Sequence, residues 1–157
     1  MLREFARASV PATYFETIQL KTRTCLQFID LTEAIKQIVA ASGIREGICN
    51  IQTQHTTTAI SVNENEPLLI RDMKMALERL ASRKRKYHHD NFAIRTVNLS
   101  PDEEENGHSH CKALFLQASE SVNVIDGKLQ LGKWQRIFLI ELDRSRDRKV
   151  SVMILGI

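Results

Sequence analysis

The sequence predicts an α+β fold, because strands lead, two or three helices intervene and a β meander ends the chain. The stretch TYFETIQLKTRTCLQFID is rich in Thr, Tyr, Phe and Ile, which predicts two strands around residues 21–23. Two later segments carry apolar residues at helical spacing. The tail, residues 121–157, has the apolar alternation that is typical of strands.

The first helix is predicted directly after these strands. Asp30 is a candidate N-cap with Glu33 three residues later, and Gly43 supplies the stop. One apolar face is expected to be buried, and it consists of Leu31, Ala34, Ile35, Ile38 and Val39.

Residues 48–62 are rich in β-branched side chains and predict one long strand, or two short ones joined near residues 55–57. Pro67 suits the first turn of a second helix. Its expected buried stripe is Leu69, Met73, Ala76, Leu77 and Leu80. The basic segment SRKRKYHHDN follows, and we expect it to be exposed.

The segment PDEEENG predicts a solvated acidic loop, and GHSHCKALFLQAS predicts a short helix entered through residues 108–110. In the tail, Asp126-Gly127 is a strong hairpin signal. Two apolar runs, RIFLIEL and VSVMILGI, flank a charged turn at residues 143–148. Their nearly continuous hydrophobicity predicts strands with both faces covered.

A chain of 157 residues predicts a single domain over residues 1–157, with residues 1–12 as a loose N-terminal arm. The formal charge of +3 does not demand a nucleic-acid or membrane partner. No run approaches the roughly 18 apolar residues of a membrane helix. Three widely spaced cysteines without a CxxC pair favour a reduced protein, so we expect a cytoplasmic location.

All five histidines fall in three places: His55, the pair His88-His89, and the pair His108 and His110. Three imidazoles from separate segments suit a divalent metal with open positions, and Asp90 could orient a ring. The alternatives are that His88 and His89 lie in a polar loop, that His108 and His110 cap a helix, and that His55 is a half-buried strand residue. Spacing alone favours these alternatives.

Two other groups have balanced interpretations. Glu64, between Asn63 and Asn65, is a candidate general acid or base, or part of a turn that leads into the Pro67 helix. The arginines of the turn at residues 143–148 are candidates for binding an anion, or for a charged surface hairpin. The run SRKRK is more typical of a solvated helix end than of a nucleic-acid site.

Four motifs resemble the YjbQ family, also called UPF0047. QHTTTAISVNENEP resembles its QHT and NEN elements, YHHD its Tyr-x-His-Asp element, and NGHSHCKALFL its Asn-Gly-His-x-His-x-Lys element. DGKLQLGKWQRIFLIELD resembles its Gly-x-Trp-Gln hairpin. The order holds from about residue 14 to the end, although the acidic segment after Asp90 is longer than in the family and the arginine turn lacks a proline.

The resemblance implies a β-sandwich with two or three packed helices, a homotrimer, and a metal pocket lined by His55, His89 and His110. It leaves His88 and His108 at variable positions. The catalytic residues that it implies are Glu64, Asn63 and Asp90. The substrate-binding residues are Thr57, Asn65, Trp134, Gln135, Arg146 and Arg148. Within this scheme His55 and Glu64 face one pocket from opposite ends of a strand.

The family carries the name secondary thiamine-phosphate synthase, so we expect a metal-binding enzyme that acts on a phosphorylated or anionic metabolite. Imidazole ligands favour zinc, whereas phosphate chemistry would also suit magnesium. The alternative is a trimeric module that binds metal and an anion without turnover. Both hypotheses predict no membrane partner, and neither requires nucleic acid.

Overall fold

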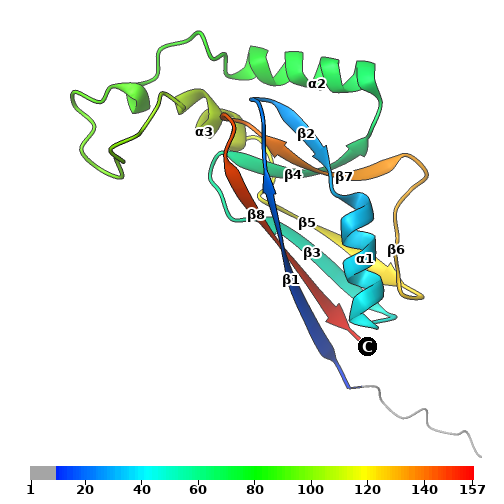
Figure 1. The fold of residues 1–157 in the computed structure, drawn as a ribbon. Coiled ribbons are helices and arrows are strands. Elements are labelled where there is room, and N and C mark those ends of the chain that lie inside the picture. The colour runs from blue at the N-terminus through cyan, green and yellow to red at the C-terminus, as the bar shows by residue number, and fades with distance from the viewer. Residues whose placement is uncertain (1–9) are drawn as a thin grey trace, which may run out of the picture.

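Strands and helices follow one another in the order that the sequence pattern predicts, although the last strands pair with other strands than expected. The computed structural model describes residues 10–157 (Figure 1). Its elements are β1 (Ala12–Lys21), β2 (Gln27–Asp30), α1 (Thr32–Ser42), β3 (Gly47–Thr53), β4 (Thr58–Glu64), α2 (Pro67–Leu80), the 3-10 helix η1 (His88–Asp90), α3 (Gly107–Ala113), β5 (Ser119–Ile125), β6 (Lys128–Leu129), β7 (Gln135–Glu141) and β8 (Asp147–Gly156). Residues 1–9 of the expected N-terminal arm lie outside the described residues.

The strands form two antiparallel sheets. The large sheet has the order β1-β8-β3-β5-β6 and the small sheet has the order β2-β7-β4. The expectation of a terminal meander is wrong, because β7 and β8 enter different sheets. β7 is buried along nearly its whole length and occupies the centre of the small sheet, whereas β8 alternates between buried and exposed residues. The α+β class itself is confirmed.

Two apolar cores hold the layers together. The larger core lies between the two sheets and includes the buried face of α1, with Ile35 and Val39. The smaller core lies around Phe138, Ile140 and Leu142 of β7 and the segment after it, and includes Leu77 of α2. The small sheet therefore has apolar partners on both faces, as β7 requires.

The predicted helix end at Gly43 and the predicted hairpin are confirmed, whereas the predicted N-cap at Asp30 is wrong by one residue. The N-cap of α1 is Leu31, which makes no side-chain cap hydrogen bond. The Asp30 Oδ1 accepts a hydrogen bond of 2.9 Å from the Thr32 N–H, and Gly43 ends α1 at φ +69°. Asp126 and Gly127 both have positive φ, at 52° and 72°, as a tight hairpin between β5 and β6 requires.

The buried stripe expected on α2 is wrong for most of its residues. Of the five, only Leu77 is buried, and Leu80 is 40% exposed. The Glu66 carboxylate caps the helix as an N-terminus should, accepting from the N–H groups of Leu68 and Leu69. However, α2 lies above the sheets and only its last turn meets the smaller core (Figure 1).

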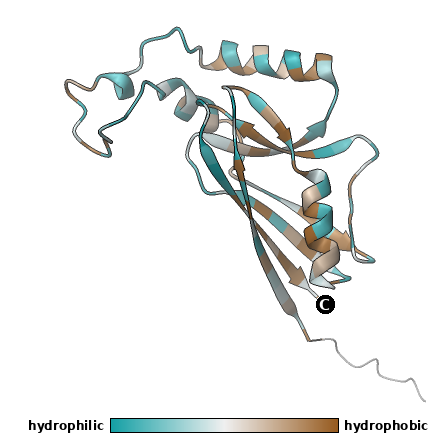
Figure 2. Ribbon diagram, viewed as in Figure 1, coloured by the Kyte–Doolittle hydropathy of each residue, from teal (hydrophilic) through white to brown (hydrophobic). Residues whose placement is uncertain are grey.

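The outer face of the large sheet is also apolar and uncovered within one chain. Phe15 pairs with Met153, and Ile48 pairs with Leu155, in the strand register. All four side chains are between 48% and 57% exposed. The hydropathy colouring shows brown segments along these strands and on α2 (Figure 2). The expectation that both faces are covered thus holds for β7 but not for β8.

Among residues 10–157 no helix has the length and apolarity to cross a membrane. The three cysteines carry free thiols, with Cys49 buried and Cys111 exposed.

Candidate functional site

His89 and His110 lie face to edge, with ring centroids 4.6 Å apart and planes at 60°. They come from η1 and α3, which the Asp90 carboxylate joins. Its Oδ1 accepts hydrogen bonds from the Asn106 N–H at 3.0 Å and the Gly107 N–H at 2.8 Å. Asp90 thereby holds the start of α3 against η1, and this contact brings the two imidazoles together.

The surroundings of this histidine pair leave polar atoms without partners. Within the described part of the chain, His89 Nε2 and Asn106 Oδ1 are buried and accept or donate no hydrogen bond. Burial lowers the pKa of His110, and the neighbouring His89 lowers it further, while the Asp143 carboxylate opposes both effects. A neutral imidazole is the form that binds a metal, and an unpartnered buried ring nitrogen is a natural ligand atom.

His55 lies in the loop between β3 and β4, beside β8. Its Nε2 accepts a hydrogen bond of 2.8 Å from the Lys149 N–H, so only Nδ1 remains for another partner. Burial lowers the pKa of His55, and the nearby Arg148 adds to this effect. Across residues 10–157, no three His, Cys, Asp or Glu side chains are grouped so that they could hold a metal ion. One chain therefore supplies the His89–His110 pair, and the third ligand stays a prediction.

Thr57 and Arg148 belong to a buried network below His55. The Arg148 guanidinium contacts both carboxylate oxygens of Glu141, at 2.7 Å and 2.6 Å, and donates to Thr57 Oγ1 at 3.0 Å. Thr22 donates to Glu141 Oε2 at 2.8 Å. Arg148 is 4% exposed, so its charge is already compensated inside the protein.

The other arginines of the turn after β7 face Asp143. Arg146 Nε lies 3.0 Å from Asp143 Oδ2, and Arg144 Nη1 lies 3.5 Å from the same oxygen. Arg144 also pairs with Glu104 at 3.1 Å, which ties the acidic segment to this turn. The predicted anion-binding arginines are therefore engaged with carboxylates of the same chain.

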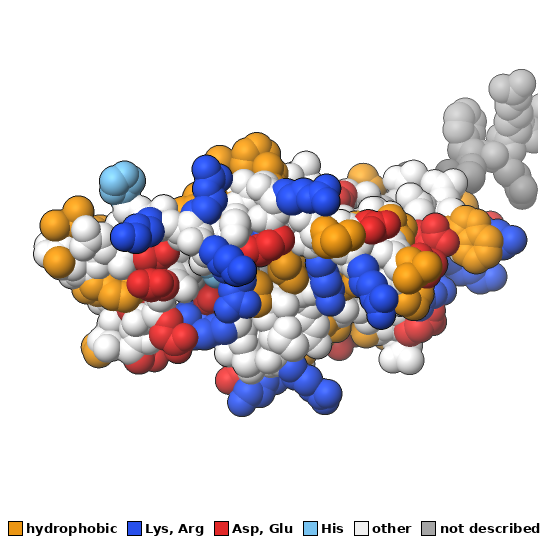
Figure 3. All heavy atoms as spheres, turned by 90° about the horizontal axis from the view of Figure 1, so that it is seen from above, with side chains coloured by type: hydrophobic (Ala, Val, Ile, Leu, Met, Phe, Trp, Pro, Cys, Tyr) orange, Lys and Arg blue, Asp and Glu red, His pale blue; other side chains and the backbone are white. Residues whose placement is uncertain are grey.

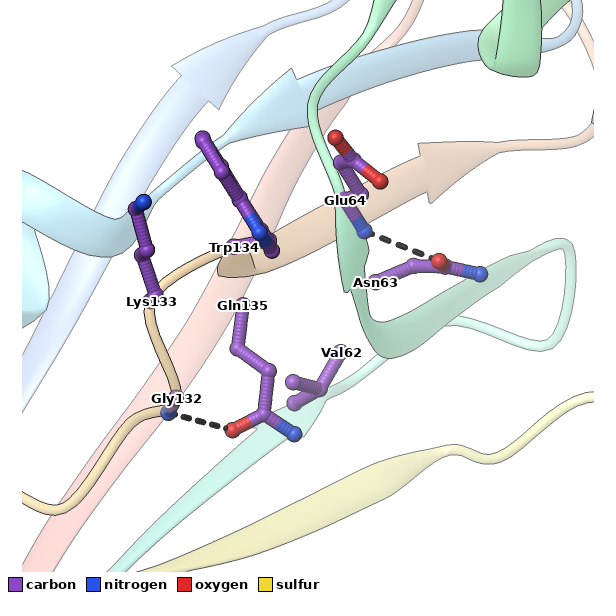
Figure 4. Close-up of a pocket in the computed structure, with 7 residues that line it drawn as sticks. All are labelled: Val62, Asn63, Glu64, Gly132, Lys133, Trp134 and Gln135. Atoms are coloured by element: carbon purple, nitrogen blue, oxygen red, sulfur yellow. Dashed lines mark hydrogen bonds between the residues drawn. The ribbon is translucent and has the colours of Figure 1, made fainter.

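Glu64 lies in a different place, a shallow pocket of about 360 Å³ that it shares with Trp134 and Gln135 (Figure 4). Asn63 Oδ1 accepts from the Glu64 N–H at 2.8 Å, and Asn65 donates to Asp30 at 3.0 Å. Both amides are thus occupied away from the Glu64 carboxylate.

The expectation that His55 and Glu64 face one pocket fails within a single chain. His55 precedes β4 and Glu64 ends it, and a strand rises about 3.3 Å per residue. The seven residues of β4 therefore separate the two side chains by about 20 Å. Glu64, Asn63, Trp134 and Gln135 lie together, but far from the histidine pair.

A buried cluster around Lys112 was not predicted from the sequence. The Lys112 side chain is fully buried, donates to the Ala81 carbonyl, and has Nζ 3.2 Å from His108 Nδ1 and 3.3 Å from the Glu78 carboxylate. Lys112 lies four residues after His108, so both occupy one face of α3. The four-residue spacing of His108 and Lys112 in NGHSHCK could have indicated that the two side chains are in contact.

Comparison with known proteins shows the family to which this chain belongs. The family model described as UPF0047 protein YjbQ-like matches residues 16–157, and the chain belongs to this family.

Curated relatives carry the same family name. A UPF0047 protein of Methanothermobacter thermautotrophicus is 36% identical over 143 residues, which cover 91% of this chain and 92% of that protein. UPF0047 protein YugU of Bacillus subtilis is 31% identical and covers 90% of this chain and 98% of its own length.

A solved structure shares the fold as well. A YbjQ-like protein of unknown function from Sulfolobus solfataricus P2 superposes with a TM-score of 0.84 at 36% identity. The match covers 94% of this chain and all of that one.

Proposed function

We propose that this protein is a small metal-dependent enzyme that acts on a phosphorylated or otherwise anionic metabolite in the cytoplasm. The observation that carries the proposal is the buried, unpartnered Nε2 of His89 beside the ring of His110. Two imidazoles in contact suit zinc, with magnesium as the alternative for phosphate chemistry. A bound divalent ion would supply Lewis-acid polarisation of a phosphoryl oxygen.

The chain's own residues have distinct parts in this proposal. Asp90 is a positioning residue, because its carboxylate holds η1 against α3 and so sets the distance between the two rings. Asn106, the residue before α3, has a buried Oδ1 without a hydrogen-bond partner. Asp143, which acts electrostatically on His110, favours a cation there.

The third ligand in this proposal is His55 of a second copy within a homotrimer. Two uncovered apolar surfaces support an oligomer: the outer face of the large sheet, around Met153 and Leu155, and the upper side of α2. His55 contacts β8 through Lys149, at the polar end of that same strand. A copy that covers the whole length of β8, from Leu155 to Lys149, would lie beside His55.

The Glu64 pocket is the proposed place for the organic part of the substrate. An exposed indole, Trp134, stands beside a carboxylate, and the Lys133 ammonium lies 4.5 Å from the Trp134 ring centroid. Aromatic and charged groups together suit a flat heterocycle with a cationic or anionic substituent. Thiamine-phosphate synthesis, which joins a pyrimidine diphosphate to a thiazole phosphate and releases pyrophosphate, has substrates of this kind.

A non-catalytic metal- and anion-binding trimer is the second candidate. The separation of Glu64 from the histidine pair within one chain favours it, because no general base then stands beside the metal. The two candidates differ in turnover and not in binding.

An activity assay with Glu64→Gln separates them. The enzyme proposal expects turnover on a panel of phosphorylated metabolites, including the thiamine precursors. Glu64→Gln should lower that turnover with metal content unchanged, because Glu64 borders the proposed pocket for the organic part of the substrate. Asn123→Asp, on the outer face of β5, is the control with a conservative polar change. Absence of turnover on the whole panel, with metal bound, would leave the binding module as the function.

A further inference from the structure

Four consecutive cations follow α2, and we call Arg83, Lys84, Arg85 and Lys86 the basic loop. All four are exposed. Of the ion pairs within residues 10–157, none involves their side chains, in contrast to the arginines of the turn after β7. Seen from above, Lys and Arg side chains gather around α2 and the segment that follows it (Figure 3).

The basic loop is held in one conformation by its flanking residues. The Tyr87 hydroxyl donates to the Ser82 carbonyl at 2.8 Å, which closes the loop at its base. The Arg83 N–H donates to Glu78 Oε1 at 2.7 Å, and the Lys84 N–H donates to Ser82 Oγ at 3.2 Å. Fixed backbone presents the cationic side chains at low entropic cost to a ligand.

These side chains line a hollow of about 660 Å³ together with Tyr87 and His88. That volume lies within the range of small-molecule sites. Two carboxylates, Asp90 and Glu105, also border the hollow. Asp90 Oδ1 already accepts hydrogen bonds from two backbone N–H groups, which partly compensate its charge. The four cations of the basic loop therefore outnumber the two carboxylates, and of these only Glu105 is free among the residues that the structure describes.

From this arrangement we infer that the basic loop binds the phosphate groups of a multiply charged small anion. The inference rests on the proposed function and names its substrate class as a diphosphate or triphosphate. The hollow is lined by His88 and Asp90, the residues that flank His89 on η1, so it lies on the same short helix as the histidine pair's His89. Arg148 is paired with Glu141 and Arg146 lies beside Asp143, so both arginines already face a carboxylate of the same chain.

A small anion fits this surface better than a nucleic acid strand. Single-stranded nucleic acid is bound through exposed aromatic rings that stack on successive bases. Of the residues that line the hollow, only Tyr87 and His88 carry rings; Tyr87 is half-buried with its hydroxyl bonded to the Ser82 carbonyl, which leaves a single exposed imidazole and no row of rings. Cationic groups without a stacking platform recognise phosphate alone.

Isothermal titration of the full-length protein with inorganic pyrophosphate tests the inference. The protein is first dialysed against EDTA, so that a bound metal cannot contribute. We expect saturable binding that weakens by about tenfold or more when all four residues of the basic loop are changed to Gln. The matched control changes Lys21, Arg23, Arg71 and Lys128 to Gln, which removes the same charge from exposed positions elsewhere.

The control should bind within about twofold of the wild type, because screening limits distant charges. Metal content is measured on each protein before the EDTA dialysis and should not change in the basic-loop variant, so failure of this inference is distinguishable from failure of the metal site. Three results would overturn the inference: no pyrophosphate binding by the wild type, equal binding by the basic-loop variant, or an equal loss in the control. Tighter binding of a single-stranded oligonucleotide than of pyrophosphate would also overturn it.

Discussion

Arg148 forms a two-pronged ion pair with Glu141, with Nη2 2.6 Å from Oε1 and Nε 2.7 Å from Oε2. The pair is buried between the strands that lead into and out of the turn after β7. It joins β8 of the large sheet to β7 of the small sheet, so the interaction connects the two layers beside His55. Arg148, which was predicted to bind an anion, therefore stabilises the fold instead.

Arg148→Met should destabilise the protein strongly, because it leaves the Glu141 carboxylate buried without its charge partner. We expect a loss of about 3–5 kcal/mol in the free energy of unfolding, measured by urea denaturation. The double variant Arg148→Met with Glu141→Leu should lose less than the single variant. A single variant as stable as the wild type would show that the pair has no structural role.

Lys112→Met should also destabilise the protein, since it leaves the Ala81 carbonyl without its side-chain donor and removes the Lys112 contact with His108 Nδ1. An unsatisfied buried polar group costs about 1–3 kcal/mol, and the methionine keeps most of the side-chain volume. Lys128→Met, at an exposed hairpin position, is the control and should change the stability by less than about 0.5 kcal/mol. Equal stability of the two variants would contradict the role assigned to Lys112.

The stability should fall on acidification because of His108. Burial lowers its pKa below the ordinary 6.5, and Lys112 lowers it further. On acidification, His108 therefore takes up a proton near pH 6.5 in the unfolded chain, but only at a lower pH in the folded chain. The contribution of neutral His108 to the free energy of unfolding is fully present above pH 6.5 and is lost as the pH falls toward the folded-state pKa. Urea denaturation between about pH 7.5 and about pH 5.5 measures the slope.

His55 and His110, whose pKa values burial also lowers, act in the same direction. His108→Asn should therefore reduce this slope without abolishing it. A stability that is constant or rises on acidification would contradict the assignment.

The large sheet should form an interface between copies of the chain. Light scattering of the wild type is expected to give three times the chain mass of 18.0 kDa. Leu155→Glu, at the centre of the exposed apolar face, should give a single chain mass, because a buried unpaired charge is costly. Lys128→Glu is the control at an exposed position and should keep the wild-type mass. A wild type with the mass of one chain would disprove the trimer.

Local signals in the sequence predicted local structure well. Gly43 ended α1 and Asp126-Gly127 made the hairpin, because each depends on the backbone of a few neighbouring residues, and the N-cap fell at Leu31, one residue after Asp30. The partners of the strands could not be predicted in this way. The apolar pattern of β7 and β8 indicates which side chains are buried, but not that the two strands enter different sheets.

The candidate site was predicted only in part, for physical reasons. The motif resemblance pointed to His89 and His110, which the fold brings together. It did not indicate that Glu64 lies at the other end of β4. Lys112 was missed because lysine is normally exposed, and its burial depends on three partners from α2 and α3. The stripe on α2 was misjudged because one chain does not cover that helix.

The metal content of the purified protein tests the central claim most directly. Elemental analysis of wild-type protein expressed with added zinc should give about one divalent ion per chain. His89→Ala and His110→Ala should each lose the metal, whereas His88→Ala, an exposed neighbour on η1, should keep it. Wild-type protein without metal, or a His89→Ala and His110→Ala double variant with wild-type metal content, would contradict the account.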